Sequence, residues 1–143
     1  MNFNLDLAKE KSDKNPVFKV QYAHARICSI FKKAPKNKTQ KVNLDLLDTV
    51  EELDLLSRII KLPEIVEETA KDYQVQRLPQ YAMELTDSFH KFYEKCKVID
   101  VENKKLTDAR LALLQTTKIA LKNTLDLMGV SAPEKMQRNE TKK

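Results

Sequence analysis

Glycine is almost absent from this chain, which has one among 143 residues. Tight hairpin turns depend on glycine and asparagine, so this scarcity disfavours a protein built on sheets. Loops that cradle phosphate groups need several glycines, which excludes Walker-type and dinucleotide-binding loops. No apolar run approaches the ~18 residues of a membrane span, and no secretory signal precedes the first charged residues. We therefore expect no membrane association.

Cysteine and histidine are also scarce, with two of each. Cys28 and Cys96 fall at core-facing helical positions, which predicts reduced, inert thiols in a cytoplasmic protein. His24 and Cys28 stand four residues apart and could share a metal on one helical face, whereas His90 and Cys96 are six apart and point in different directions. Buried cysteine and hydrogen-bonded histidine are the commoner arrangement, so we expect neither a metal site nor a nucleophile.

The residues that are present describe a charged, soluble domain with an uneven distribution of charge. Apolar residues make up 41% and charged residues 33%, and the net charge is +5. Residues 1–42 carry ten Lys or Arg against three Asp or Glu, whereas residues 43–73 carry three against nine. Such asymmetry is typical of a protein with one face for a polyanion, although solvated faces without a partner produce it too. Adjacent carboxylates such as Glu51 and Glu52 are interpreted as solvated charge.

Helical periodicity predicts an all-α bundle of about five helices. The first spans 16–33, because Asn15 can cap it, Pro16 suits its first position and Pro35 stops it. Thr49 and Glu52 form a capping box that opens the second helix. Its predicted core face consists of Leu53, Leu56, Ile59 and Ile60.

Three further helices complete the predicted bundle. Pro63 begins the third, which runs to about Tyr73, and Pro79 begins the fourth. Thr107 caps the fifth, and Gly129 stands where a left-handed C-cap is wanted. The fourth helix has an apolar stripe at nearly ideal spacing, consisting of Leu78, Ala82, Leu85, Phe89, Phe92 and Cys96.

The first helix has two faces. The predicted core stripe consists of Val17, Val20, His24, Ile27, Cys28 and Phe31. Phe18, Tyr22 and Arg26 follow one another at intervals of four and form a second stripe, with Lys19 beside it. Tyr93 and Lys97 repeat the pairing of ring and cation on the fourth helix. Such groups grip unstacked bases and phosphates, but they equally serve as the rim of a core, and the residues alone leave both readings open.

Four separated blocks resemble one known family. They lie at residues 15–30, at 85–98, at 108–113 (Asp-Ala-Arg-Leu-Ala-Leu) and at 125–136. In this order they are similar to the C-terminal, DALR-type anticodon-binding domain of bacterial-type arginyl-tRNA synthetases. The resemblance covers the chain from about Phe3 to Met136 and implies an all-α bundle.

The resemblance implies that this domain grips the anticodon stem-loop of arginine tRNA. A separate upstream catalytic domain would perform the ATP-dependent aminoacylation, with ATP and magnesium, in the same polypeptide. No HIGH-like or KMSK-like signature occurs here. We therefore expect a monomeric fragment that has no cofactor or catalytic residue of its own. Residues 1–14 are expected to be the junction, 15–136 the helical domain and 137–143 a polar, disordered tail.

The expected contacts with the anticodon follow from both arguments. Tyr22 and Tyr93 would stack on splayed bases, and Arg26 would hold phosphate. The full predicted set is Phe18, Lys19, Gln21, Tyr22, Arg26, Tyr93, Lys97 and Met136. Lys19 departs from the resemblance, since relatives often carry an aromatic residue there, and so does the chain beyond Met136. Two alternatives stay open: a helical protein–protein interaction module, and a freestanding tRNA-binding factor.

Overall fold

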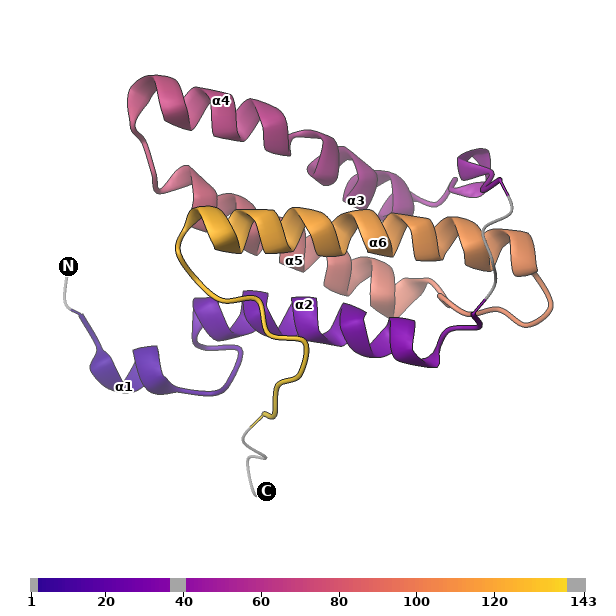
Figure 1. The fold of residues 1–143 in the computed structure, drawn as a ribbon, viewed down its shortest axis with the longest axis horizontal. Helices are drawn as coiled ribbons and strands as arrows, with labels where there is room; N and C mark the ends of the chain where they lie inside the picture. Colours follow the sequence, from indigo (N-terminus) through magenta and orange to yellow (C-terminus); the bar gives the residue numbers. More distant parts are fainter. Residues whose placement is uncertain (1–2, 37–40, 139–143) are drawn as a thin grey trace.

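The computed structural model describes residues 3–36 and 41–138, and these form helices and no strand (Figure 1). The elements are α1 (Leu5–Lys9), α2 (Pro16–Lys33), the short 3-10 helix η1 (Leu44–Leu46), α3 (Val50–Ile60), α4 (Leu62–Asp72), α5 (Arg77–Lys95) and α6 (Lys104–Leu127). The predicted all-α class is confirmed, and the five predicted helices correspond to α2 through α6. Most of the predicted tail, residues 139–143, lies outside the described residues.

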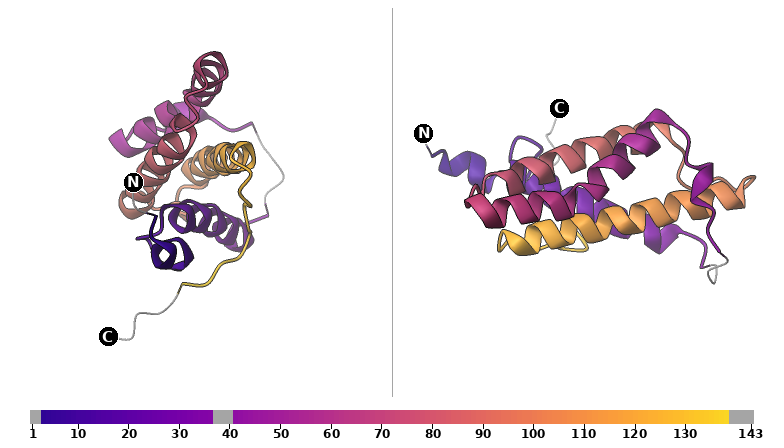
Figure 2. Two further views of the ribbon diagram at one scale, coloured as in Figure 1. Left: turned by 90° about the vertical axis from the view of Figure 1, so that its left-hand side faces the viewer. Right: turned by 90° about the horizontal axis from the view of Figure 1, so that it is seen from above.

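The helices form three layers. α5 and α6 lie side by side in the middle, α2 packs against both from one side, and α3 packs against both from the other (Figure 2). α4 continues from α3 and contacts α5. The largest side chains that are fully buried come from all three layers, among them Ile27, Leu55, Phe89, Phe92, Leu114 and Leu121. No helix in the described part of the chain is long and apolar enough to cross a membrane.

The start of α2 is fixed by Asn15, as predicted. Its side-chain oxygen accepts from the backbone N–H of Val17 at 3.1 Å and of Phe18 at 3.5 Å, which satisfies two free amides of the first turn. Its side-chain nitrogen donates to the backbone oxygens of Ala8 and Glu10, both at 3.0 Å. One buried side chain therefore caps α2 and ties the segment containing α1 to it.

Other helix ends are confirmed in part. The Thr49–Glu52 capping box opens α3, and Gly129 adopts a φ of 70° just after α6. The prediction that Thr107 caps the last helix is wrong, because α6 begins at Lys104 and Asn103 is its N-cap. Thr107 instead donates its hydroxyl to the backbone oxygen of Asp100 at 3.0 Å and accepts from that residue's N–H at 2.8 Å, which fastens the loop before α6.

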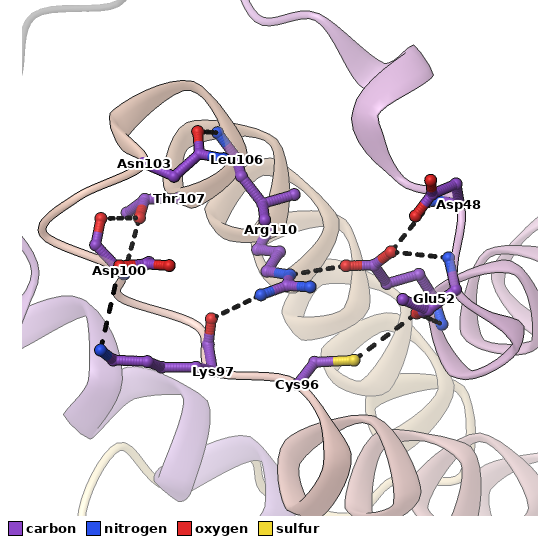
Figure 3. Close-up of polar contacts among 10 residues, drawn as sticks. Asp48, Glu52, Cys96, Lys97, Asp100, Asn103, Leu106, Thr107 and Arg110 are labelled. Carbon is purple, nitrogen blue, oxygen red and sulfur yellow. Dashed lines mark hydrogen bonds and ion pairs between the residues drawn. The ribbon is translucent and has the colours of Figure 1, made fainter.

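A buried ion pair joins α3 to α6 (Figure 3). Glu52 is completely buried, and its Oε1 accepts from Nε of Arg110 at 2.6 Å. Its Oε2 accepts from the backbone N–H groups of Asp48 and Thr49, both at 3.0 Å. Nη1 of Arg110 donates to the backbone oxygen of Lys97 at 2.8 Å, just beyond the end of α5. The pair therefore connects three segments and leaves neither charge without a partner.

This pair corrects two predictions about α3. Glu52 is not solvated charge, and the helix is rotated relative to the predicted core face. Leu53 and Ile60 are 49% and 67% exposed, whereas Leu55 and Ile59 are buried. Hydrophobicity alone predicts that the Glu52 carboxylate lies at the surface. Its ion pair with Arg110 on α6 compensates for burial, and the helix orientation that buries Glu52 also buries Leu55.

Arg110→Met is expected to destabilise the fold strongly, since it leaves the Glu52 carboxylate buried without a cation. Breaking one side of a buried pair costs about 3–5 kcal/mol of unfolding free energy. Urea denaturation followed by circular dichroism measures the change. Lys122→Met is the matched control, because Lys122 forms an exposed pair with Asp126 on the same helix and should cost under about 1 kcal/mol. Equal losses in the two variants would contradict the structural role of the pair.

The same carboxylate predicts a dependence of stability on pH. Burial by itself raises the pKa of Glu52, but hydrogen bonds from Arg110 and Thr49 outweigh burial and hold the pKa below its ordinary value of 4.5. Its contribution to stability is therefore complete above 4.5 and is lost as the pH falls through the lower, folded-state pKa. The difference in unfolding free energy between the parent chain and Glu52→Gln should be constant above this value and shrink below it. A difference that does not change with pH would refute the assignment.

Candidate nucleic-acid interface

A groove runs along the face of α2 that points away from the α3–α4 layer. Its volume, about 1270 Å³, exceeds the ~300–1,000 Å³ typical of a small-molecule pocket. α1, α2, the exposed end of α5 and the segment after α6 all contribute to its walls. Among its charged residues one is acidic, Glu10, and six are basic: Lys9, Lys11, Arg26, Lys32, Lys33 and Lys135. Such a surface suits an extended polyanion better than a small neutral ligand.

Arg26 lies between two tyrosine rings at the centre of the groove. Its guanidinium carbon is 5.5 Å from the centroid of Tyr22 and 5.5 Å from that of Tyr93, and its Nη2 donates to the Tyr22 hydroxyl at 3.2 Å. Burial by itself lowers the pKa of Arg26, but interactions with Tyr22 and Tyr93 outweigh burial and raise the pKa above its ordinary value. The guanidinium therefore stays charged. Tyr93 is 39% exposed and Tyr22 is partly exposed. The structure thus brings together three predicted site residues from two helices.

The two faces predicted for α2 are partly wrong. Phe18 is 5% exposed and Val17 is 48% exposed, so the predicted free ring is buried and the predicted core residue is not. The reason is that α2 touches both α5 and α6, which makes its buried face broader than a single stripe. Phe18 stacks under Tyr22 with ring centroids 5.9 Å apart and an interplanar angle of 22°. It therefore supports Tyr22.

Lys19 and Lys97 do not line the groove. Nζ of Lys19 pairs with Oδ1 of Asp87 on α5 at 2.5 Å. The predicted helical spacing of Tyr93 and Lys97 is wrong, because α5 ends at Lys95 and Lys97 follows its C-cap. Nζ of Lys97 lies 3.9 Å from Asp100 instead, beside the loop that precedes α6 (Figure 3).

The segment after α6 crosses α2 and completes the groove (Figure 1). Nε2 of Gln21 donates to the backbone oxygen of Ser131 at 2.8 Å, so this predicted contact residue holds the protein's own chain. Nδ1 of His24 is 3.0 Å from the backbone oxygen of Pro133; since a carbonyl only accepts, this nitrogen carries the proton. These contacts place Met136 among the residues that line the groove, and its contact with the anticodon stays a prediction.

His24 lies on the core side, which confirms the prediction for it, and Cys28 and Cys96 are buried free thiols. Burial raises the pKa of Cys28, so its thiol stays protonated and unreactive. Nδ1 of His24 is 3.9 Å from Sγ of Cys28. Across residues 3–36 and 41–138, no group of three or more His, Cys, Asp or Glu is arranged to hold a metal ion.

Arg138, which contacts Tyr22, and several cations that line the groove are absent from the predicted site. Arg138 places its guanidinium carbon 4.3 Å from the centroid of Tyr22, and its Nη2 contacts Asp13 at 2.7 Å. This position belongs to the predicted polar tail, residues 137–143. The missed groove cations are Lys9, Lys11, Lys32, Lys33 and Lys135. The basic character of residues 1–42 and of the C-terminal part indicated such cations, but only the fold shows which ones share a surface.

The fold is an all-α domain whose groove sets aromatic rings among cations, an arrangement that suits single-stranded nucleic acid. Comparison with known proteins identifies its family. Residues 20–136 match the family model described as the DALR anticodon binding domain. The chain belongs to this family.

Individual relatives agree with this assignment. The chain is 46% identical over 140 residues to an arginine–tRNA ligase of Citrifermentans bemidjiense, covering 95% of this chain and 25% of the relative. It is 48% identical over 139 residues to the corresponding ligase of Geotalea daltonii, covering 94% and 25%. Among solved structures, arginyl-tRNA synthetase of Thermus thermophilus matches with a TM-score of 0.79 and 29% identity over 95% of this chain and 24% of that one. The chain therefore spans about a quarter of the length of these relatives.

Gln21→Ala is expected to loosen the segment that closes the groove, because it removes the amide that holds Ser131. A net hydrogen bond contributes about 0.5–1.5 kcal/mol, so trypsin cleavage after Lys135 should accelerate roughly twofold to tenfold. Timed proteolysis with mass spectrometry measures the rate. Gln115→Ala, on an exposed position of α6, is the control and should cleave at the parental rate. Unchanged cleavage in Gln21→Ala would show that this contact does not hold the segment.

Proposed function

We propose that this chain is the anticodon-binding domain of an arginine–tRNA ligase and that its groove holds the anticodon stem-loop of arginine tRNA. The observation that carries the proposal is Arg26, held between Tyr22 and Tyr93 in a groove lined by cations. Aromatic rings that flank a cation suit unstacked bases and the phosphates between them. The identity of 46–48% to arginine–tRNA ligases supports arginine tRNA as the particular RNA.

We propose that different side chains of the groove bind different parts of the RNA. The exposed ring of Tyr93 and the ring of Tyr22 would stack on bases that leave the loop, and Met136 would pack against them as an apolar wall. Lys32 and Lys33, at the end of α2, would hold the phosphates that lead toward the stem. Arg26 would contact a phosphate or a base edge between the two rings, since its charge is maintained there.

In the relatives, the matched region is about a quarter of the protein, and we propose that the ligase reaction takes place in the part outside that region. Arginine, ATP and magnesium would bind in that catalytic part, and the groove described above would contribute by orienting the tRNA. We further propose that this catalytic domain is the domain's partner within the same polypeptide. We also propose that the protein acts as a monomer in the cytoplasm.

The rival is a helical module that docks another protein through its exposed apolar side chains. Val50, Leu53 and Ile60 on α3 are each at least 49% exposed and could serve such a role. The two functions differ in their response to RNA and salt. An anticodon-binding domain should prefer an arginine anticodon hairpin over a hairpin with a scrambled loop, and its affinity should fall steeply with salt. Indifference to RNA would favour the rival.

Tyr22→Ala is expected to weaken binding of an arginine anticodon hairpin by about tenfold, because one base–aromatic stack contributes about 1–3 kcal/mol. Fluorescence anisotropy with a labelled hairpin measures the affinity, and circular dichroism checks that helicity is unchanged. The control is Tyr73→Ala, since Tyr73 is 83% exposed and does not line the groove. Equal affinity of Tyr22→Ala and the parent chain would refute the stacking role.

A further inference from the structure

The ring of Tyr22 is already covered in the free protein. The guanidinium carbon of Arg138 lies 4.3 Å from its centroid, closer than the 5.5 Å of Arg26. Both guanidinium groups lie over the ring, but Arg26 also donates to the Tyr22 hydroxyl, whereas Arg138 has the closer approach to the ring centre. A planar cation at this separation occupies the space that a stacked base would need. Base and guanidinium therefore cannot both lie on this side of Tyr22.

Arg138 is held there by a second contact and by the course of the chain. Its Nη2 lies 2.7 Å from Oδ1 and 2.8 Å from Oδ2 of Asp13, in the loop before α2. Upstream, Gln21 and His24 hold the backbone of Ser131 and Pro133 against α2. The segment 131–138 is thus attached at its start, and Arg138 is the attachment at its far end.

The far attachment is the weaker one. The side chains of Arg138 and Asp13 are 42% and 50% exposed, so water screens their ion pair. A cation–π contact at an exposed site is similarly weak. Together the two contacts favour the closed arrangement by roughly threefold to tenfold, a bias that a bound RNA can overcome.

We propose that Arg138 is an intramolecular competitor for the base-binding ring of Tyr22, and that RNA binding displaces it. The inference rests on the proposed function, because it takes Tyr22 as a stacking platform. In the closed state Arg138 takes the place of a base: its planar guanidinium lies over the ring, and its charge is paired with Asp13. On binding, the Asp13 contact breaks, the guanidinium leaves the ring and a base takes its place.

The geometry favours competition over a role for Arg138 as a phosphate ligand. Asp13 already occupies Nη2 of Arg138, and its negative charge would repel a phosphate approaching the same point. The groove offers other cations for that purpose, among them Lys135 on the same segment. A phosphate ligand and a competitor give opposite results when the arginine is removed.

The test is the affinity of Arg138→Ala for an arginine anticodon hairpin, measured by fluorescence anisotropy with the 143-residue chain. Removing a cation ordinarily weakens RNA binding, yet we expect this variant to bind roughly threefold to tenfold more tightly, because the closed state is lost. Lys135→Ala is the matched control: it removes a cation from the same segment and should weaken binding. Equal or weaker binding by Arg138→Ala would overturn the competition.

A second background separates this inference from the proposed function. In a Tyr22→Ala chain, Arg138→Ala should give no tightening, since no ring remains to compete for. Tightening of the same size in that background would overturn the role of the ring. If the parent chain itself shows no preference for the arginine hairpin, the proposed function fails. The competition is then judged by the side-chain Nε–H signal of Arg138 in NMR, which Tyr22→Ala must shift if the contact exists in solution.

Discussion

The buried pair of Glu52 and Arg110 is the interaction on which the arrangement of the bundle depends. It joins the first turn of α3 to α6, and through the backbone oxygen of Lys97 it also fixes the end of α5. α5 and α6 are thereby held together as the middle layer on which α2 packs. α2 and α5 run in the same direction (Figure 1), so Lys19, near the start of α2, reaches Asp87 in the middle of α5, and Arg26 reaches Tyr93 further along both helices. An ion pair remote from the groove thus helps to set the register at which its central cluster forms.

The groove belongs to no single helix. α2 supplies Tyr22 and Arg26, α5 supplies Tyr93, and the segment after α6 supplies Met136. Asn15 couples the first part of the chain to α2, and His24 couples the last part to it. Residues that face inward or toward the chain itself therefore position those that face the groove. His24 therefore contributes to the site by holding the segment after α6 against α2.

Local signals in the sequence were sufficient for several helix ends, but not for the starts of α5 and α6. Asn15, the Thr49–Glu52 box and Gly129 act through nearby backbone groups, and their predicted roles agree with the structure. The apolar stripe of α5 was also predicted correctly, because it packs on both neighbouring layers. The sequence-based predictions were wrong where the position of a side chain depends on a partner far away in the sequence. Glu52 is buried because of a residue 58 positions away, and Arg138 meets Tyr22 through a chain path that no local pattern encodes. Predictions of binding by Tyr22, Tyr93 and Met136 rested on resemblance and chemistry and stay predictions.

The most direct test of the account is an NMR titration of the isotope-labelled chain with an arginine anticodon hairpin. We expect backbone amide signals to shift along α2, at Tyr93 and in residues 131–138, while those of α3 and α4 stay in place. Shifts centred on the exposed apolar side chains of α3, or no shifts at all, would contradict the claim that the groove beside α2 is the RNA-binding surface.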